Sequence, residues 1–401
     1  MSNKVSSIRT RCPVCKAKGI DIILEITKIP VLCNLLWPSQ KKALLATTGN
    51  IELGFCKNCG HIFNAAFESE LVEYTQAYEN SLYFSPHFQD YTKSLATYLI
   101  NRYSLYEKNI IEIGCGKGNF LKLMCELGNN RGIGFDPTYS PQQSENNNST
   151  EKITFIHDFY SEHYSSYKAD FICARHVLEH IQNPCDFLST IRRSIGKRLK
   201  TAVFFEVPNA LFTLRNLGIW DIIYEHCSYF SAYTLSYLFH SCDFKVCDLR
   251  ETYNSQYLTI EALPVKDYEI SKYPYYTDTD LESLASEIKL FAGKYRQKIE
   301  YWRCNLKKMK QRGKKVVVWG GGSKGVTFLN IIGIQGLIDY VIDINPRKQG
   351  RYIAGAGQQV VTPEFLQIYK PDVIIIMNPI YKDEIQQILQ KLSLNPDILR
   401  A

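Results

Sequence analysis

The chain has 401 residues, which suggests two or three domains and excludes a single small binding module. Apolar residues make up 45% and charged residues 22%, close to the averages of soluble globular proteins, so a largely disordered chain is excluded. The formal net charge of +7 is a mild excess for this length. Because proteins that bind nucleic acid through charge are usually more basic and more clustered in charge, we expect no nucleic-acid partner and an anionic small-molecule substrate.

The sequence contains no segment typical of a membrane protein. Its first residues lack an apolar run of signal-peptide length, and no stretch of 18 apolar residues occurs. We therefore expect a cytoplasmic protein without a membrane partner.

Four of the thirteen cysteines are spaced as metal ligands: Cys12 with Cys15, and Cys56 with Cys59. A C-x-x-C turn lets two thiolates converge on one ion, and two such turns fill a tetrahedral site. A complete set of four cysteines predicts structural zinc, since a catalytic zinc keeps a position open. Two disulfides, free thiols and a redox dithiol are the alternatives, which a cytoplasmic location and the doubled motif disfavour.

Residues 109–120 predict a strand, a glycine turn and a helix, with glycines at positions 114, 116 and 118. Glycines at such a turn let the backbone approach a ligand and leave helix N–H groups free to bind it. A second strand, residues 131–136, ends in Asp136 about 20 residues later, where ribose hydroxyls need an acceptor. In a third, residues 153–159, Asp158 and Phe159 are placed to bind and stack an adenine.

Glu112 precedes the glycines, and the pattern E-x-G-x-G-x-G resembles motif I of class I S-adenosylmethionine-dependent methyltransferases. Residues 176–181, His-Val-Leu-Glu-His-Ile, resemble a segment common in the same class. The resemblance implies an α/β, Rossmann-like core that binds S-adenosylmethionine. The cofactor-binding candidates are Glu112, Gly114, Gly116, Gly118, Asp136, Asp158, Phe159, Arg175, Tyr78 and Ser81.

The C-terminal part of the sequence predicts a long helix and a second nucleotide-type unit. Apolar residues recur every three or four positions from Leu281 to Met309, which predicts one amphipathic helix docked on the core. A coiled-coil dimer is the alternative, but aromatic side chains would pack poorly in its seam. Residues 316–325 again predict strand, glycine turn and helix, and further strands at 338–342 and 372–377 predict a parallel sheet.

Residues 204–209, Phe-Phe-Glu-Val-Pro-Asn, and 220–231 point to a narrower family. With the cysteine pairs before them and the second Rossmann-like unit behind, they resemble the three-domain sugar C-methyltransferases over essentially the whole chain. The resemblance implies a zinc-binding domain (1–75), a methyltransferase domain (76–265), a helical linker (266–312) and a Rossmann-like C-terminal domain (313–401).

Enzymes of this family methylate nucleotide-linked 4-keto-deoxysugars at the carbon beside the ketone, after removing its proton. Glu225 and His226 match the last two positions of the family motif Tyr-His-Glu-His, which implies that His226 is the general base. Imidazole suits this step because it titrates near neutral pH. Glu225 would orient the ring or hold its protonated state, and His180 matches another active-site histidine that polarises the ketone or binds the sugar.

The sequence departs from the family motif at two positions, with Ile223 in place of tyrosine and Tyr224 in place of the first histidine. An apolar Ile223 cannot stabilise an enolate, so either Tyr224 or His180 takes that role or no enolate forms. In the second case His226 deprotonates a hydroxyl, and the product is O-methylated. A non-catalytic protein that binds a nucleotide sugar is a further alternative.

Basic and polar residues of the second half are candidates for binding the nucleotide sugar. A glycine turn at a helix N-terminus and nearby cations would suit a diphosphate, although a solvated basic face is the alternative. Packing is the alternative for Tyr78 and Ser81, whose segment in the family covers the cofactor. We expect a monomer or homodimer. The substrate-binding candidates are Asn209, Gly321, Lys324, Arg347 and Arg351.

Overall fold

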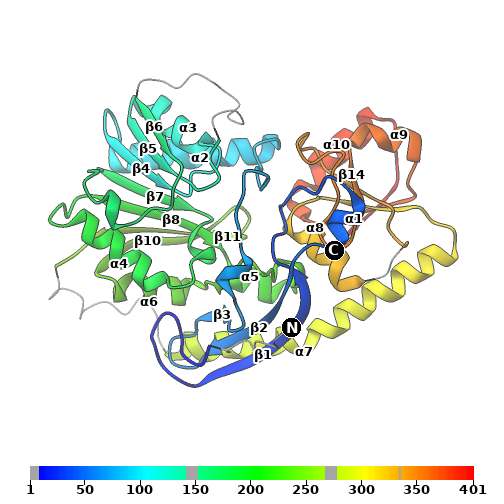
Figure 1. Ribbon diagram of the computed structural model, residues 1–401, viewed down its shortest axis with the longest axis horizontal. Helices are drawn as coiled ribbons and strands as arrows, with labels where there is room; N and C mark the ends of the chain where they lie inside the picture. Colours follow the sequence, from blue (N-terminus) through cyan, green and yellow to red (C-terminus); the bar gives the residue numbers. More distant parts are fainter. Residues whose placement is uncertain (1–8, 141–151, 267–277, 334–335) are drawn as a thin grey trace.

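The computed structural model describes residues 9–140, 152–266, 278–333 and 336–401 (Figure 1). The described strands form sheets of four, seven and five strands. In the view of Figure 1 the seven-stranded sheet lies on the left, the C-terminal unit on the right and strands β1 to β3 below. Among these residues, no helix is both long and apolar enough to cross a membrane.

The four-stranded sheet is antiparallel, in the order β1-β2-β3-β9. Its last strand comes from far along the chain, where Tyr229 pairs with Ile62. The N-terminal sheet is thereby fastened to the segment that carries Glu225 and His226. The strands are β1 (Ile20–Pro30), β2 (Thr48–Cys56), β3 (Ile62–Asn64) and β9 (Ser228–Tyr229).

The seven-stranded sheet has the order β10-β11-β8-β7-β4-β5-β6. The five strands from β8 to β6 are parallel, and β11 runs antiparallel to its two neighbours, β8 and the edge strand β10. Parallel strands crossed by helices make a Rossmann-like sheet, which confirms the predicted class I methyltransferase fold. The elements are α2 (Pro86–Tyr103), β4 (Asn109–Ile113), α3 (Asn119–Gly128), β5 (Arg131–Phe135), β6 (Ile153–Ile156), β7 (Phe171–Arg175), α4 (Pro184–Ile195), β8 (Ala202–Pro208), α5 (Ala210–Arg215), α6 (Ala232–Ser241), β10 (Phe244–Thr252) and β11 (Tyr257–Pro264).

The C-terminal sheet is parallel throughout, in the order β14-β13-β12-β15-β16, as expected for a second Rossmann-like unit. The N-terminal segment reaches this unit as well, since Gly355 N–H donates to Ala43 O over 2.8 Å. The elements are α1 (Gln40–Leu44), β12 (Val316–Trp319), α8 (Ser323–Ile332), β13 (Tyr340–Ile342), β14 (Gln359–Val361), α9 (Leu366–Tyr369), β15 (Val373–Ile376), α10 (Lys382–Lys391) and β16 (Asp397–Arg400).

One helix of 34 residues, α7 (Asp278–Gln311), connects the two Rossmann-like units (Figure 1). Its predicted apolar stripe, from Leu284 to Leu306, is buried in a cluster shared with β1, β2, α8 and residues 219–224. The helix therefore docks on the core of its own chain, as the aromatic residues of the stripe predicted. The domain boundaries themselves stay a prediction.

Phe291 lies on the buried face of α7 and is 0% exposed, whereas its neighbour Leu290 is 54% exposed. We expect Phe291→Ala to lower the free energy of unfolding by about 3–5 kcal/mol, because it leaves a cavity where three parts of the chain meet. The matched control Leu290→Ala is expected to change it by less than about 0.5 kcal/mol. Urea unfolding followed by circular dichroism measures both, and equal losses would contradict this placement of the helix.

Candidate active site

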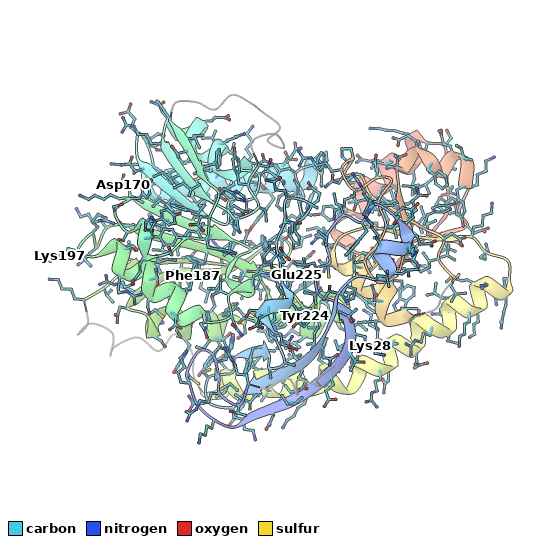
Figure 2. The ribbon with its side chains drawn as sticks, in the orientation of Figure 1. Lys28, Asp170, Phe187, Lys197, Tyr224 and Glu225 are labelled. Atoms are coloured by element: carbon cyan, nitrogen blue, oxygen red, sulfur yellow. The ribbon has the colours of Figure 1, made fainter. Side chains whose placement is uncertain are left out.

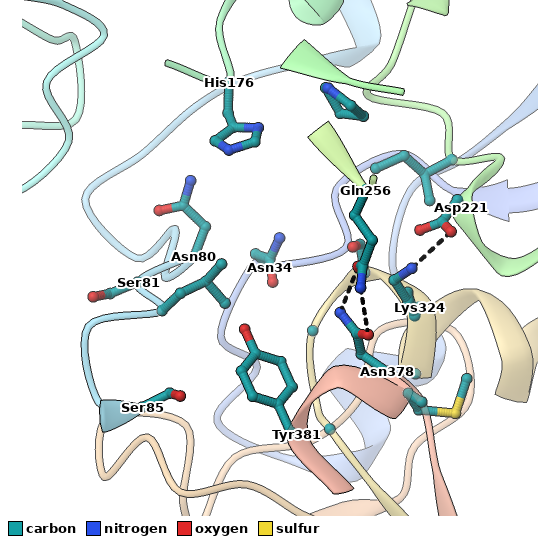
Figure 3. Close-up of a pocket in the computed structure, with 18 of the residues that line it drawn as sticks. Asn34, Asn80, Ser81, Ser85, His176, Asp221, Gln256, Lys324, Asn378 and Tyr381 are labelled. Carbon is teal, nitrogen blue, oxygen red and sulfur yellow. Dashed lines mark hydrogen bonds and ion pairs between the residues drawn. The ribbon is translucent and has the colours of Figure 1, made fainter. Parts of the chain in front are cut away.

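A cavity of about 340 Å³ opens between the seven-stranded sheet and the C-terminal unit. Its walls come from residues after β7, the segment before β9, the glycine turn after β12, and the chain between β3 and α2. Figure 3 shows Asn80, His176, Asp221 and Lys324 among the residues around this space. The cavity lies at the carboxyl ends of the parallel strands, where open α/β sheets bind their ligands.

Two histidines face each other in the cavity wall. The rings of His180 and His226 lie 4.9 Å apart at an angle of 77°. His180 Nδ1 lies 3.0 Å from Glu225 O, and because a carbonyl oxygen only accepts, Nδ1 carries hydrogen in this arrangement. Burial, followed by the charge of His180, lowers the pKa of His226 to about 3. His226 is therefore neutral at pH 7, in the form that accepts a proton.

Glu225 is buried, and both of its carboxylate oxygens are hydrogen-bonded to groups other than His226. Its Oε1 accepts from the backbone N–H of Cys33 over 2.5 Å, and its Oε2 accepts from the hydroxyl of Tyr78. Burial raises the pKa of Glu225 and outweighs these contacts. Figure 2 shows Glu225 near the middle of the molecule. The side chain connects the N-terminal segment to the cavity wall through Cys33 and Tyr78.

Ile223 and Tyr224, the two departures from the family motif, differ in their position relative to the cavity. Ile223 lines the cavity. Tyr224 is fully buried but is not among the described residues that line it, and its hydroxyl accepts from Glu68 N over 2.9 Å. The ring also fills the space beside Gly49. Tyr224 thus packs on the N-terminal sheet, which leaves His180 as the predicted replacement for the missing tyrosine.

Arg175, a predicted cofactor ligand, is engaged in a buried ion pair. Its Nη2 lies 2.8 Å from Glu206 Oε1, and its guanidinium lies 4.5 Å from the centre of the Phe120 ring. His176 Nε2 lies 3.1 Å from the same oxygen of Glu206. Burial lowers the pKa of His176, but Glu179 and Glu206 outweigh it and raise the pKa to about 9. His176, which was not among the candidate site residues from the sequence, also lines the cavity.

The glycine turn between β4 and α3 fits a cofactor that lies against the backbone. Gly114, Gly116 and Gly118 have φ of 69°, 55° and 79°, in the left-handed region that favours glycine. A Cβ on Gly114 or Gly118 would meet Val177 or Phe155 at 2.2 and 2.4 Å, whereas one on Gly116 would meet no described atom within 4 Å. Gly116 therefore faces open space that a bound group can occupy.

The acidic candidates surround this turn in different ways. Glu112 is buried with Oε2 lacking a hydrogen-bond partner among the described residues, and burial raises its pKa to about 8. Asp136 follows β5, and its Oδ2 accepts from Gly116 N over 2.8 Å. Asp158 accepts from Phe159 N over 2.7 Å, and the Phe159 ring is 62% exposed. An exposed aromatic ring beside a carboxylate fits the binding of a purine.

The predicted cations on the C-terminal side are mostly paired within the protein. Lys324 lines the cavity and lies 2.7 Å from Asp221, as Figure 3 shows. Arg347 pairs with Glu79 at 3.2 Å, and Arg351 is exposed and is not among the described cavity-lining residues. Lys348 lines the cavity and donates to Asn34 Oδ1 over 3.2 Å.

Gly321 and Asn209 have roles in the fold. Gly321 donates through its backbone to Asp343 Oδ2 over 2.8 Å. Asn209 caps α5, with Oδ1 accepting from Leu211 N over 3.0 Å, while its Nδ2 donates to Ser255 O over 2.9 Å. Neither is among the described residues that line the cavity. Of the tyrosine-rich segment, Tyr78 and Ser81 do line it.

Gln256 and Asn378, neither of which was a candidate from the sequence, form a reciprocal amide pair in the cavity wall (Figure 3). Asn378 Nδ2 donates to Gln256 Oε1 over 2.9 Å, and Gln256 Nε2 donates to Asn378 Oδ1 over 3.2 Å. The two residues are 122 positions apart, in the turn before β11 and in the segment after β15, so no local pattern predicts their meeting. Tyr253 and Tyr381 extend this contact with a hydrogen bond of 2.8 Å between their hydroxyls.

The four predicted metal-ligating cysteines lie together at the edge of the N-terminal sheet. Cys12 and Cys59 Sγ lie 3.6 Å apart, Cys15 and Cys56 Sγ lie 3.5 Å apart, and all four sulfurs are within 4.8 Å of one another. These separations are too long for disulfides, whose S–S bond is about 2.05 Å. They are close to the roughly 3.8 Å that a tetrahedral zinc with Zn–S of about 2.3 Å requires, so the residues fit a zinc ion.

Comparisons with known proteins identify related methyltransferases. Residues 88–249 match a family model described as a methyltransferase domain, and residues 283–395 match one described as a C-methyltransferase C-terminal domain. The chain is 24% identical over 289 residues to the C-methyltransferase NovU of Streptomyces niveus, an alignment that covers 69% of this chain and 67% of the relative.

Similar solved structures include a magnesium protoporphyrin IX methyltransferase from Synechocystis PCC 6803, with TM-score 0.35 and 15% identity over 44% of this chain and 83% of that one. Another is the complex of the Haloferax volcanii Trm112 activator with a methyltransferase, with TM-score 0.38 and 13% identity over 46% of this chain and 93% of that one.

The matching domains and the sheet order define an S-adenosylmethionine-dependent methyltransferase. Its C-terminal domain matches the C-terminal domain of C-methyltransferases, and its curated relative is a C-methyltransferase, so the chain is similar to C-methyltransferases. The resemblance stated from the sequence is confirmed at this level.

The raised pKa of His176 predicts a pH-dependent contribution to stability. Because the folded pKa of about 9 lies above the unfolded value of about 6.5, protonated His176 stabilises the fold fully below about pH 6.5 and loses this effect as pH rises through 9. We expect His176→Gln to cost more unfolding free energy at pH 6.5 than at pH 9.5 in urea titrations. His163→Gln, at an exposed position, is the control, and an equal cost at both pH values would contradict the ion pairs.

Proposed function

We propose that this enzyme transfers a methyl group to carbon in a nucleotide-linked 4-keto-deoxysugar, beside the ketone, with His226 as general base. The observation that carries the proposal is the pair of histidines, His180 and His226, in a cavity shared with the C-terminal unit. The match to a C-methyltransferase C-terminal domain supports carbon as the acceptor atom.

His226 would remove the proton beside the ketone. In this step the C–H bond breaks, its electron pair stays on the substrate, and the proton moves to a ring nitrogen of His226. The lowered pKa keeps the ring neutral before the reaction, and the ring is partly buried in the cavity wall. General-base catalysis of this kind contributes typically about 10²–10⁴-fold to the rate.

His180 is oriented to meet a hydroxyl of the sugar or the enolate oxygen. With hydrogen on Nδ1 and directed at Glu225 O, a neutral His180 presents Nε2 as an acceptor, and a protonated ring presents a donor. The neutral ring would therefore bind a sugar hydroxyl, and the protonated ring would stabilise negative charge on the ketone oxygen. Tyr78, held by Glu225, would complete this wall.

The nucleotide diphosphate would lie at the C-terminal side of the cavity. The turn Gly320–Gly322 precedes the N-terminus of α8, whose free N–H groups favour anions. Lys324 and Lys348 line the same region and would exchange their present partners, Asp221 and Asn34, for phosphate oxygens. The Gln256–Asn378 pair offers amide donors and acceptors to polar groups of the substrate.

S-adenosylmethionine supplies an electrophilic methyl group on its sulfur. Among this chain's residues, the glycine turn from Gly114 to Gly118 would approach its backbone-facing part, Asp136 would accept from ribose hydroxyls, and Asp158 with Phe159 would hold the adenine. Holding two reactants in one orientation supplies much of the acceleration in such transfers.

A structural zinc held by Cys12, Cys15, Cys56 and Cys59 would stabilise the N-terminal sheet. The set is complete with four thiolates, so it leaves no open position for chemistry. The ion would tie the first turn of the chain to the β2–β3 turn.

O-methylation of a sugar or related metabolite is the second candidate, because Ile223 lines the cavity where the family motif has tyrosine. In that case His226 would take a proton from a hydroxyl. The two functions differ in the atom that carries the new methyl group.

We expect His226→Asn to reduce methyl transfer and solvent-deuterium exchange beside the ketone by at least about 10²-fold. The reason is that the variant lacks the base that removes the proton from the carbon beside the ketone. The affinity for S-adenosylhomocysteine, measured by calorimetry, is expected to stay within about twofold, since the glycine turn is untouched. Exchange is read by NMR with thymidine diphosphate-linked 4-keto-6-deoxyhexose, with His163→Asn as control. Undiminished exchange would refute the proposed base.

Cys56→Ser is expected to lower the zinc content below one ion per chain and to lower the melting temperature, because it removes one of four ligands. Cys304, which is exposed and outside the cluster, provides the matched control Cys304→Ser. Elemental analysis of the purified proteins measures the metal. A fully zinc-loaded Cys56→Ser protein would contradict the four-cysteine site.

A further inference from the structure

Glu179 is a buried carboxylate between the two cavity-lining histidines in sequence, His176 and His180. It belongs to a short 3₁₀ helix, Leu178–His180, and is 2% exposed. Its Oε1 lies 3.5 Å from His176 Nδ1, and its Oε2 has no hydrogen-bond partner among the described residues. Leaving a buried ionised oxygen unpaired is costly, so this atom is suited to a charge that is present during only part of the catalytic cycle.

The residues behind Glu179 hold it in the ionised form. His176 lies between Glu179 and Glu206, and Arg175 pairs with Glu206 from the adjacent strand. Burial raises the pKa of Glu179, but the hydrogen bond from His176 and the nearby histidines outweigh it and lower the pKa. His176 also has a left-handed backbone, φ 55°, which is uncommon outside glycine and concentrates at functional sites.

Glu225, the neighbour of His226 in sequence, is already engaged elsewhere. Both of its oxygens accept hydrogen bonds, from Cys33 N and from the hydroxyl of Tyr78. These contacts direct the carboxylate toward the N-terminal segment. Glu225 therefore has little capacity left to neutralise a charge on His226.

We propose that Glu179, and not Glu225, is the counter-ion that stabilises His226 when this base is protonated. The proposal rests on the proposed function, in which His226 removes the substrate proton. One carboxylate oxygen of Glu179 and one ring nitrogen each of His180 and His226 lie within 4.8 Å of one another. As the C–H bond breaks and the N–H bond forms, the ring gains one positive charge and Glu179 keeps its negative charge. In this role Glu179 is a positioning residue that acts through His226.

The other charged groups around His226 oppose its protonation. Burial, His180, His176 and Lys324 all lower its pKa, whereas Glu179 raises it. The ring of Tyr229 also faces it, with ring centres 6.0 Å apart. Loss of the carboxylate charge at position 179 would therefore make His226 a weaker base without touching the glycine turn of the cofactor.

The test compares Glu179→Gln, Glu179→Asp and Glu225→Gln for deuterium exchange and for the pH profile of kcat/KM, with thymidine diphosphate-linked 4-keto-6-deoxyhexose as the probe. We expect Glu179→Gln to slow exchange about 10- to 100-fold and to move the acidic limb to lower pH, since His226 becomes less basic. Glu179→Asp keeps the charge and is expected to leave the limb in place. Glu225→Gln is expected to alter KM through Tyr78 and Cys33 without moving the limb.

Each other outcome identifies a different failure. If Glu179→Gln has a wild-type pH profile and His226→Asn is inactive, Glu179 is not the counter-ion, and the proposed function still stands. Exchange that survives His226→Asn overturns the proposed function itself. If Glu225→Gln is the one variant that shifts the acidic limb of the pH profile, Glu225 and not Glu179 is the counter-ion. A second metal ion per chain that Glu179→Gln removes would make the cluster of Glu179, His180 and His226 a metal site and overturn the counter-ion. Should Glu179→Gln fail to fold, Glu179→Ser takes its place with the same expected shift.

Discussion

The apolar stripe of α7 is the contact on which the rest of the structure depends. It packs against the N-terminal sheet, α8 and residues 219–224, so one continuous core joins three parts of the chain. Residues 222–224 in that core directly precede Glu225 and His226. Because packed interiors transmit small displacements, the position of the histidine in the cavity depends on packing between elements far apart in sequence. The same core includes residues of β12 and β15, so it also connects the C-terminal sheet to the segment that forms this wall of the cavity.

The cavity wall next to the sheet is built from charges that compensate one another. Arg175, Glu206, His176 and Glu179 form an alternating series that starts in the sheet and ends beside His226. Burying any one of these groups alone would be costly, but alternation lets each stay ionised. The series places the negative charge of Glu179 near His226. His226 is a neutral base, because burial lowers its pKa. On the opposite wall, lysines paired with Asp221 and Asn34 face the region proposed for phosphate.

Local patterns in the sequence were enough to predict the two parallel sheets, the glycine turn, α7 and the cysteine cluster, but not the antiparallel N-terminal sheet. Each of these depends on spacing within one or two segments, such as the left-handed glycines after β4 or the two C-x-x-C turns. The directions of side chains were harder to predict, since tertiary packing decides them. Tyr224 packs beside Gly49, Arg175 pairs with Glu206, and Gln256 meets Asn378 across the cavity, and none of these contacts has a signal in the sequence. Glu179 lies in residues 176–181, a segment that was recognised from the sequence. Only the structure shows that its Oε2 has no hydrogen-bond partner among the described residues.

The position of the transferred methyl group tests the account most directly. The enzyme would be incubated with methyl-¹³C S-adenosylmethionine and a nucleotide-linked 4-keto-6-deoxyhexose, and the product examined by heteronuclear NMR. The account predicts a labelled methyl on the carbon beside the ketone, with loss of the hydrogen that His226 removes. A labelled methyl on oxygen would contradict it, and would assign the cavity and its histidines to deprotonation of a hydroxyl.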